Sequence, residues 1–378
     1  MTELIGDNTG NYVYYLAVYS YLFGMKNVTC LGIDEIQQHL SKDKDYMKKN
    51  FDIAIMAEAN LFAPCYKETA LIDNANFIES LKIPCFVLGI GCQNDIRHTL
   101  NNLKCINGEV KRYVDIVLNS GGMLTLRGDL TAAYLKSLGY KNIPVLGCPS
   151  IYINGLAFQI PNKKVSLDAF KPMYNAQYVQ DLDRRLYTDY PNSAFFDQDR
   201  YLKSLFEPLN AKNEDCLQNK LFIKLYEYGR ILGDINYYPW KQKILDGGFN
   251  FSYGSRIHGN IIAIQSGIPA FVKVIDSRTR KIAEFYDIPN SLQYPFDEKK
   301  DSLYDLYKSI DFSTFNKKYT ERFNRFKNFL SQITGQSSTS NYLSENGQDF
   351  ISYLSTKKYP QYDMNYQTTD EAKKLILE

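Results

Sequence analysis

The chain has 378 residues, enough for about two domains of ordinary size. Its 44 Lys and Arg against 42 Asp and Glu leave a net charge of +2, which excludes the strong basic excess of a general nucleic-acid binder. Hydrophobic residues make up 44% and charged residues 23%, so the composition excludes a disordered chain and fits a globular protein.

Cysteine usage and hydropathy predict the compartment. The seven cysteines contain no C-x-x-C pair, which favours buried thiols in a reducing environment. The most apolar stretch, residues 12–23, is too short to cross a bilayer, which takes about 18 apolar residues. It follows Asp7 and Asn8 instead of a basic segment, unlike a signal peptide. We therefore expect a cytoplasmic protein, and leave open a peripheral association with the inner face of the membrane.

The first half of the chain predicts strands alternating with helices. Apolar runs of strand type occur at residues 3–5, 28–31, 51–56, 84–90, 114–118, 123–126 and 143–146. Helices are expected at residues 12–23, 34–40, 77–81 and 130–138, with Asp34 as an N-cap and Gly139 ending the last helix. This alternation predicts a doubly wound parallel sheet.

The second half predicts another α/β unit and a polar tail. Residues 151–220 are less regular, with weak strand signals at 165–167 and 193–196 and a helical signal at 201–209. From Trp240 the chain reads as a helix, a strand at 249–252, a helix at 259–266 and a strand at 270–275. Helical spacing recurs at 303–310 and 323–330, residues 331–348 have linker composition, and a capping box at 368–371 precedes a last short helix. We therefore divide the chain into residues 1–150, 151–330 and 331–378.

The strongest candidate for chemistry is the turn at residues 254–259, GSRIHG, between a strand and a helix. The N-terminus of that helix offers unpaired N–H groups to a phosphate or carboxylate. Arg256 adds a planar guanidinium suited to either anion, and His258 adds a group that carries a proton near neutral pH. The alternative is an Arg and a His that only cap or salt-bridge a surface turn.

The same turn resembles a signature of the polysaccharide pyruvyl transferase family, in which G-[ST]-R-x-H-G precedes a helix and a G-x-P strand. Further resemblances follow at residues 276–280, Glu284 and 288–289. Three more lie in the first half: residues 84–91, residues 126–139 around Arg127 and Gly139, and the G-C-P-S element at 147–150. The four elements occur in the family's order, each at a boundary between a strand and a loop, and cover about residues 80–150 and 240–290.

The resemblance implies two Rossmann-like domains of the GT-B type, with an active site in the cleft between them and a helical tail. It also implies transfer of pyruvate from phosphoenolpyruvate to two hydroxyls of a sugar in a cell-surface polysaccharide or its precursor, forming a cyclic ketal. The expected partners are that donor and a nucleotide-linked, lipid-linked or polymeric sugar acceptor. No cofactor is required, and no metal-ligand spacing occurs in the sequence.

Site residues follow from the residues and the resemblance together. For the donor we expect Arg256, Arg127, Ser255, Gly259 and Asn260, with a salt bridge from Arg127 to Asp129 as the alternative. For catalysis we expect His258, as general acid or phosphate ligand, and Glu58, a carboxylate after a strand. For the acceptor we expect Asp7, Asn8, Asn11 and Gln93, although the first three also fit an ordinary helix-capping turn.

Two other function classes stay open at this point. A GT-B glycosyltransferase with a nucleotide-sugar donor would use the same fold and the same anion site at a helix start. No C-terminal pair of glutamates typical of such enzymes surrounds Gly254. A non-catalytic sugar-binding or anion-binding relative is disfavoured, because both Arg256 and His258 are present.

Overall fold

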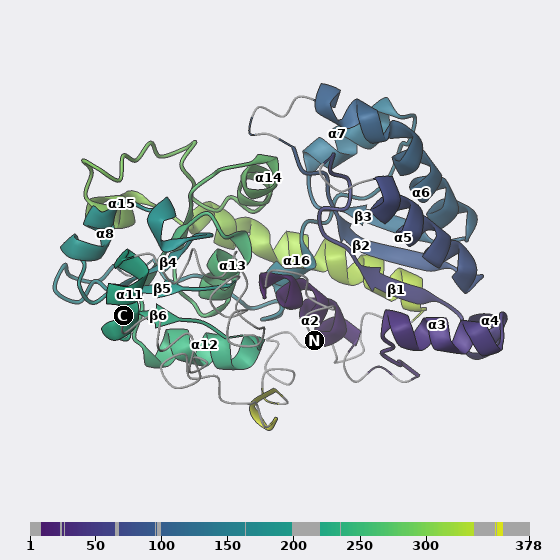
Figure 1. Ribbon diagram of the computed structural model, residues 1–378, viewed down its shortest axis with the longest axis horizontal. Helices are drawn as coiled ribbons and strands as arrows, with labels where there is room; N and C mark the ends of the chain where they lie inside the picture. Colours follow the sequence, from purple (N-terminus) through teal and green to yellow (C-terminus); the bar gives the residue numbers. More distant parts are fainter. Residues whose placement is uncertain are drawn as a thin grey trace.

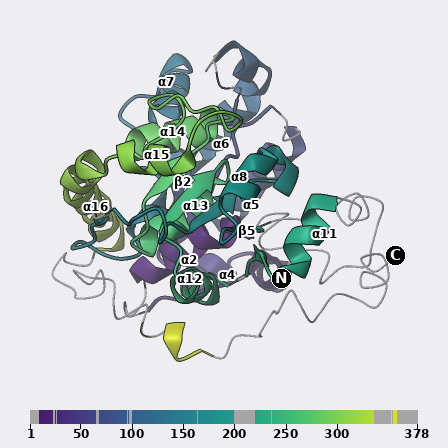
Figure 2. The ribbon, with the colours of Figure 1, turned by 90° about the vertical axis from the view of Figure 1, so that its left-hand side faces the viewer.

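The protein is an α/β protein with two parallel sheets, of three and five strands, followed by C-terminal helices (Figure 1). The computed structural model describes residues 9–22, 25, 27–64, 68–94, 96, 100–162, 164–198, 220–234, 236–335, 352 and 354–357. Each sheet lies in its own half of the molecule, and the two halves are joined by helices (Figure 1). Seen along the long axis, the second half lies in front of the first (Figure 2).

The first sheet has the order β1-β2-β3, all parallel. Its central strand is buried on both faces, as expected for a parallel strand between helices. Leu88 faces one core cluster, whereas Cys85 and Val87 face another. Leu126 also bridges to Val145, so the chain returns beside β3. The strands are β1 (Ala54–Ala57), β2 (Cys85–Ile90) and β3 (Met123–Leu126).

The second sheet has the order β6-β5-β4-β7-β8, again all parallel. The chain therefore starts in the middle, builds outward on one side and then crosses to the other. Such an order places a topological switch point between β4 and β7, where ligands bind in open α/β sheets. The strands are β4 (Pro172–Asn175), β5 (Ala194–Phe196), β6 (Ile231–Leu232), β7 (Phe251–Gly254) and β8 (Ala270–Val272).

Helices cover both sheets. In the first half, α5 and α6 pack against each other beside β2 and β3, and α7 follows β3. In the second half, α13 is buried all round, between the core clusters on either side of it. The helices of the two halves are α3 (Ile33–Lys42), α4 (Tyr46–Asn50), α5 (Glu68–Leu81), α6 (Asn107–Asn119), α7 (Asp129–Ser137), α8 (Arg184–Asp189), α11 (Lys220–Glu227), α12 (Tyr237–Asp246), α13 (Ile257–Gln265), α14 (Ser277–Tyr286) and α15 (Leu303–Ser309).

Two helices tie the halves together. The first helix, α2 (Gly10–Leu22), contacts β1 of the first sheet and α12 and α13 of the second half. The 22-residue helix α16 (Ser313–Thr334) runs from one half to the other (Figure 1). Phe326 of α16 meets Tyr21 of α2 with ring centroids 4.8 Å apart, and Arg325 donates to the carbonyl of Val145 beside the first sheet. The apolar residues of both helices thus share one core with both sheets.

Several predictions from the sequence need correction. Residues 28–31, of which 28–30 are exposed, form no strand in the described chain, and residues 165–167 form none either. Residues 114–118 lie in α6, because their apolar side chains form one face of a helix and not a strand. Residues 143–146 contribute a single bridge at Val145. Asp34 lies inside the first turn of α3, whose N-cap is Gly32.

The first residues of the predicted C-terminal linker, 331–334, belong to a helix instead. Helix α16 continues to Thr334, and Gly335 ends it in a left-handed conformation. Leu354 is buried in a core cluster with Val13 and Trp240, so at least this part of the tail packs on the fold. The expected elements at 3–5, 201–209 and 368–377 lie outside the described residues. Among the described helices, none is both long and apolar enough to cross a membrane.

Candidate active site

The candidate site lies where the carboxyl ends of the two sheets meet. Asn175 and Gly254 end the neighbouring strands β4 and β7, which flank the switch point of the second sheet. Glu58 and Arg127 follow β1 and β3 of the first sheet. Side chains from both sheets therefore reach a common region, as expected for a ligand site in doubly wound sheets.

The turn after β7 has a backbone that glycine makes possible. Gly254 has a φ of +152°, and a Cβ there would lie 1.9 Å from the backbone oxygen of Asn175. Two residues further on, the backbone N–H of Arg256 donates to that same oxygen at 2.9 Å. At Gly259 a Cβ would lie 2.2 Å from the Asn175 side-chain oxygen and 2.3 Å from the Gln198 amide nitrogen. Both glycines thus let the turn and helix α13 approach β4 closely.

A buried polar network fixes the start of α13. The Asn175 side chain accepts from Gln198 at 3.2 Å and donates to Ser252 at 2.7 Å. Ser252 donates to the Asn260 side chain at 2.7 Å, and Asn260 in turn donates to the carbonyls of Gly254 and Arg256. Because Asn175, Ser252 and Asn260 bond to one another and to the carbonyls of the turn, the network fixes the backbone of the turn. Helix α13 begins at Ile257, so His258 and Gly259 lie in its first turn.

Arg127 reaches the site from the first sheet. It is only 3% exposed, and its guanidinium donates to the Asn60 side chain at 3.1 Å and to the backbone carbonyl of Glu58 at 3.4 Å. The expected alternative of a salt bridge to Asp129 is absent among the described contacts. Buried Nε of Arg127 has no hydrogen-bond partner among the described residues. This cation therefore has capacity left for an anionic ligand.

Tyr14 of α2 links the two halves of the site. Its ring lies 5.7 Å from the guanidinium carbon of Arg127, a cation–π distance, and 5.7 Å from the His258 ring. Burial raises the pKa of the Tyr14 hydroxyl well above its ordinary value, so it stays protonated. The aromatic helix α2 is thus a wall of the site as well as a connection between the halves.

His258 is buried and surrounded by cations. It is 6% exposed, and this burial lowers its pKa well below the ordinary value, with the charges of Arg127, Arg278 and Arg256 lowering it further. Its Nε2 lies 4.0 Å from the thiol of Cys148, in the G-C-P-S element. The imidazole is therefore neutral at neutral pH as long as no negative charge enters the site.

Two arginines of the second half complete the positive charge. Burial and the neighbouring charge of Arg278 lower the pKa of Arg256 to about 10, an effect that the carboxylates of Asp197 and Asp181 oppose. Arg278 lies in the first turn of α14, 3.5 Å from the carboxylate of Asp276, and its buried Nε has no partner among the described residues. Arg127, Arg256 and Arg278 thus concentrate positive charge around His258, and such a cluster of partly desolvated cations favours binding of an anion.

Glu58 supplies the carboxyl group of the site. Burial raises its pKa from 4.5 to about 7, against the opposing effects of Arg127 and a hydrogen bond from the backbone of Ala59. A carboxyl group with a pKa near 7 is suited to both accepting and donating a proton at neutral pH. It lies close enough to Tyr14 and Tyr15 of α2 that its charge raises the pKa of both hydroxyls.

The chain matches the family described as Polysaccharide pyruvyl transferase over residues 8–277, which include every side chain of this site except Arg278. That match covers more than half of the sequence. The chain belongs to the polysaccharide pyruvyl transferase family. It is therefore an enzyme whose family implies a pyruvate donor and a polysaccharide acceptor. No curated protein matches the chain closely enough to be named as a relative.

The residues predicted for the donor lie close together in the structure. Arg127, Arg256 and His258 share the site, as their mutual electrostatic effects require. Ser255, Gly259 and Asn260 are buried in the turn and in α13. The side chain of Asn260 is engaged by three protein groups, which favours a positioning role over direct contact with the donor.

The residues predicted for the acceptor are less concentrated. Asn11 lies in the first turn of α2. Gln93 follows β2, and its amide donates to the carboxylate of Asp276 at 3.4 Å, so it joins the two halves. Asp7 and Asn8 lie outside the described residues. The roles of all four in acceptor binding stay predictions.

Three site residues of the transferase were not expected from the sequence. Tyr14 sits in an aromatic run that reads as core, and nothing in its spacing marks it. Arg278 lies within the family-like segment 276–280, and Cys148 lies within the G-C-P-S element. The family resemblance therefore points to both residues, although it assigns neither a role in the site. Within the described residues, no group of three or more His, Cys, Asp or Glu side chains is arranged to hold a metal ion.

Proposed function

We propose that this enzyme transfers pyruvate from phosphoenolpyruvate to two hydroxyls of a sugar in a cell-surface polysaccharide or its precursor, forming a cyclic ketal. The single observation that carries the proposal is the meeting of Arg127, Arg256, Arg278 and a buried, neutral His258 in one place. We further propose a GT-B arrangement, with residues 1–150 and 151–330 as its two domains, working in the cytoplasm or at the inner face of the membrane.

The donor suits the charge of the site. Phosphoenolpyruvate carries a phosphate and a carboxylate on three carbons, so it needs several cations and N–H groups that converge. Arg256 and Arg278 come from one half and Arg127 from the other, and the unsatisfied N–H groups at the start of α13 lie beside them. The buried Nε groups of Arg127 and Arg278, unpartnered among the described residues, are natural donors to these anionic oxygens.

Donor binding changes the protonation of His258. Without a donor, burial and three arginine charges hold its pKa low. The negative charges of the donor offset those of the arginines, so the pKa of His258 rises and the ring takes up a proton. His258 is then able to protonate the methylene carbon of the donor, but only after the donor has bound.

The proposed reaction balances in bonds and protons. One sugar hydroxyl adds to the central carbon of phosphoenolpyruvate while the methylene carbon gains a proton and becomes a methyl group. The second hydroxyl then displaces phosphate from the same carbon, and phosphate leaves with the remaining hydroxyl proton. Glu58, with a pKa of about 7, is our candidate to remove a proton from an attacking hydroxyl.

Phosphate release tests the proposal. The enzyme is incubated with phosphoenolpyruvate and a panel of nucleotide-linked, lipid-linked and free oligosaccharide acceptors, and inorganic phosphate and product mass are measured. We expect phosphate release that depends on the acceptor, and a product heavier by one pyruvyl ketal. Release of a nucleoside diphosphate from a sugar nucleotide, with no phosphate from phosphoenolpyruvate, would instead identify a GT-B glycosyltransferase.

A further inference from the structure

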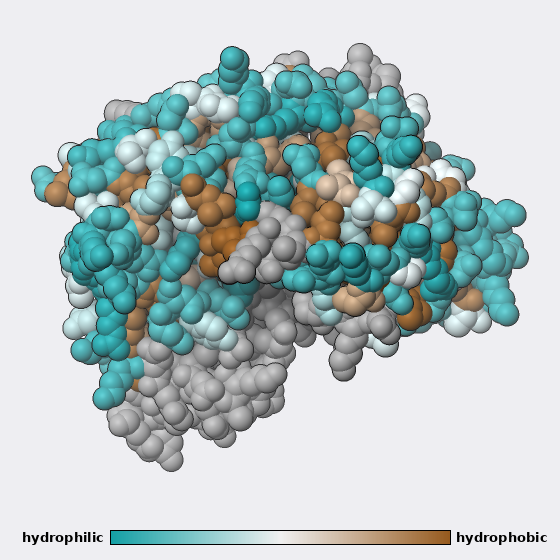
Figure 3. All heavy atoms as spheres, turned by 90° about the horizontal axis from the view of Figure 1, so that it is seen from above, coloured by the Kyte–Doolittle hydropathy of each residue, from teal (hydrophilic) through white to brown (hydrophobic). Residues whose placement is uncertain are grey.

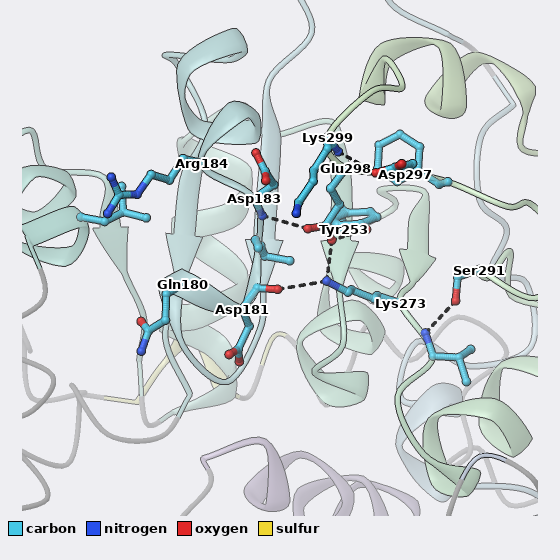
Figure 4. Close-up of a pocket in the computed structure, with 14 residues that line it drawn as sticks. Gln180, Asp181, Asp183, Arg184, Tyr253, Lys273, Ser291, Asp297, Glu298 and Lys299 are labelled. Atoms are coloured by element: carbon cyan, nitrogen blue, oxygen red, sulfur yellow. Dashed lines mark hydrogen bonds and ion pairs between the residues drawn. The ribbon is translucent and has the colours of Figure 1, made fainter.

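A cavity of about 730 Å³ lies in the second half. Its lining residue Asp181 is close enough to act electrostatically on Arg256, which forms the arginine cluster of the candidate site together with Arg127 and Arg278. Figure 4 shows its lining, with Gln180 and Arg184 on one side, Ser291 on the other and the pair of Lys273 and Glu298 between them. The wall is built from the segment after β4, from Tyr253 of β7, from the segment after β8 and from residues 296–299. Its volume falls within the usual range of small-molecule sites.

The wall of this cavity is preorganised around Glu298. The Glu298 carboxylate accepts from the backbone of Asp183 at 2.8 Å, from the Tyr253 hydroxyl at 2.7 Å and from Lys273 at 2.6 Å. Lys273 donates a second hydrogen bond to the backbone carbonyl of Asp181 at 3.0 Å (Figure 4). Because these bonds join four separate segments, the shape of the cavity is fixed by the fold.

The charges on the lining nearly cancel. Four carboxylates and three cations line the cavity, and two of the carboxylates and two of the cations belong to exposed residues. Such a surface does not select an anion, in contrast to the neighbouring arginine cluster. It does offer many hydrogen-bond donors and acceptors to an uncharged polar ligand. The carboxylates are those of Asp181, Asp183, Asp297 and Glu298, and the cations are those of Arg184, Lys273 and Lys299.

Phe296 gives the cavity an aromatic face. Its half-buried ring packs edge-on against Tyr253, with ring centroids 5.5 Å apart, which leaves part of the ring open to the cavity. Sugar rings present C–H groups that pack on aromatic faces, and their hydroxyls bond to the carboxylates and amines around them. An aromatic ring in a polar lining of balanced charge is thus typical of a site for a neutral sugar.

Two segments connect this cavity to the arginine cluster. Lys273 and Val274 line the cavity directly after β8, and the same segment continues through Asp276 to Arg278 of the cluster. Asp181 lines the cavity after β4, and in Figure 4 its carboxylate points away from Glu298. A ligand that spans both places would have one end at the arginines and the other in the cavity.

We propose that this cavity binds a neutral sugar unit of the acceptor glycan, next to the unit that receives pyruvate. The proposal rests on the proposed function, since it assumes that an acceptor glycan reaches the arginine cluster. With this cavity, the enzyme recognises more than one sugar residue of the acceptor glycan. Figure 3 shows hydrophilic residues over much of the visible face of the described part, with apolar residues exposed in patches.

The test uses two aromatic residues of one loop. Phe296→Ala removes the ring that lines the cavity. Tyr294→Ala is the matched control, because Tyr294 is also half-buried but packs on Phe271, with ring centroids 6.4 Å apart, and does not line the cavity. Binding of an array of neutral di- to tetrasaccharides is measured for each protein. Phe296→Leu serves as a second variant that keeps apolar bulk, and calorimetry with phosphoenolpyruvate alone is run in parallel.

The outcomes separate this inference from the proposed function. We expect Phe296→Ala and Phe296→Leu to bind the best neutral oligosaccharide about 5- to 10-fold more weakly than wild type, while Tyr294→Ala binds it normally. All proteins should bind phosphoenolpyruvate equally. Equal glycan binding by the Phe296 and Tyr294 variants, or no neutral glycan bound by wild type, would overturn the inference. Absence of phosphoenolpyruvate binding in every protein would count against the proposed function instead.

Discussion

Replacing the buried carboxyl of Glu58 should stabilise the enzyme in a way that depends on pH. Burial raises the pKa of this group from 4.5 to about 7. The folded protein therefore binds more protons than the unfolded chain between these pH values, and its stability falls as the pH rises through this window. Above pH 7 the folded protein bears the full free-energy cost of burying the charged Glu58 carboxylate, and below pH 4.5 this cost is absent.

The size of the effect follows from the same shift. Each pH unit of difference corresponds to about 1.4 kcal/mol, so a shift from 4.5 to about 7 gives about 3 kcal/mol at most. Because Glu58 is only partly buried as a residue, solvent screens some of this, and we expect Glu58→Gln to gain about 1–3 kcal/mol at pH 8. The amide is nearly the same size and carries no charge at any pH, so the gain should fall below about 1 kcal/mol at pH 5.

Urea unfolding at pH 5, 6, 7 and 8 measures this gain. The matched control is Glu321→Gln, an exposed glutamate of α16, which should change stability by no more than about 0.5 kcal/mol at each pH. A gain for Glu58→Gln that is the same at pH 5 and pH 8, or a loss at pH 8, would refute the reasoning. If Glu58 also acts on the acceptor, the same variant should lose turnover while it gains stability.

Four further predictions concern the turn after β7. Arg256→Ala should weaken phosphoenolpyruvate binding about 10- to 100-fold by calorimetry, through loss of a charged hydrogen-bonding partner, and unchanged affinity would contradict its role. His258→Asn should keep the fold but lose about 10²- to 10⁴-fold in turnover, and donor binding at neutral pH should take up a proton in wild type but not in this variant. Gly259→Ala should lower the free energy of unfolding in urea by about 1–3 kcal/mol, because the new Cβ would clash with Asn175. The control is Gly267→Ala, where a Cβ has open space but φ is +78°, so only backbone strain contributes. Cys148→Asp should raise the pKa of His258, so donor binding should take up fewer protons near neutral pH than in wild type.

The local order of the chain was readable from the sequence. Strand β2, helix α7 with its C-terminal Gly139 and the sequence of elements from α12 to β8 were predicted correctly, because burial in a parallel sheet and helical periodicity leave a direct pattern. The strand prediction for residues 114–118 is wrong because a short apolar run fits a buried strand and one face of a helix equally well.

The candidate site was readable only in part. Arg256 and His258 belong to the six-residue segment 254–259, which contains two glycines. That segment is recognisable because only glycine at these two positions lets the chain pass so close to β4. No sequence pattern marks Tyr14 as a site residue, because its role depends on where α2 lies relative to both sheets.

By itself, the sequence determined the strand–turn–helix units and the family, because hydrophobic period, glycine positions and capping act over a few neighbouring residues. Tertiary structure decided which units became neighbours. The order β6-β5-β4-β7-β8 placed Asn175 beside Gly254, and the packing of α2 brought Arg127 within reach of His258. It also set the protonation of the site. Burial raises the pKa of Glu58, and burial together with the charge of Arg127, more than 100 residues away in the chain, lowers the pKa of His258.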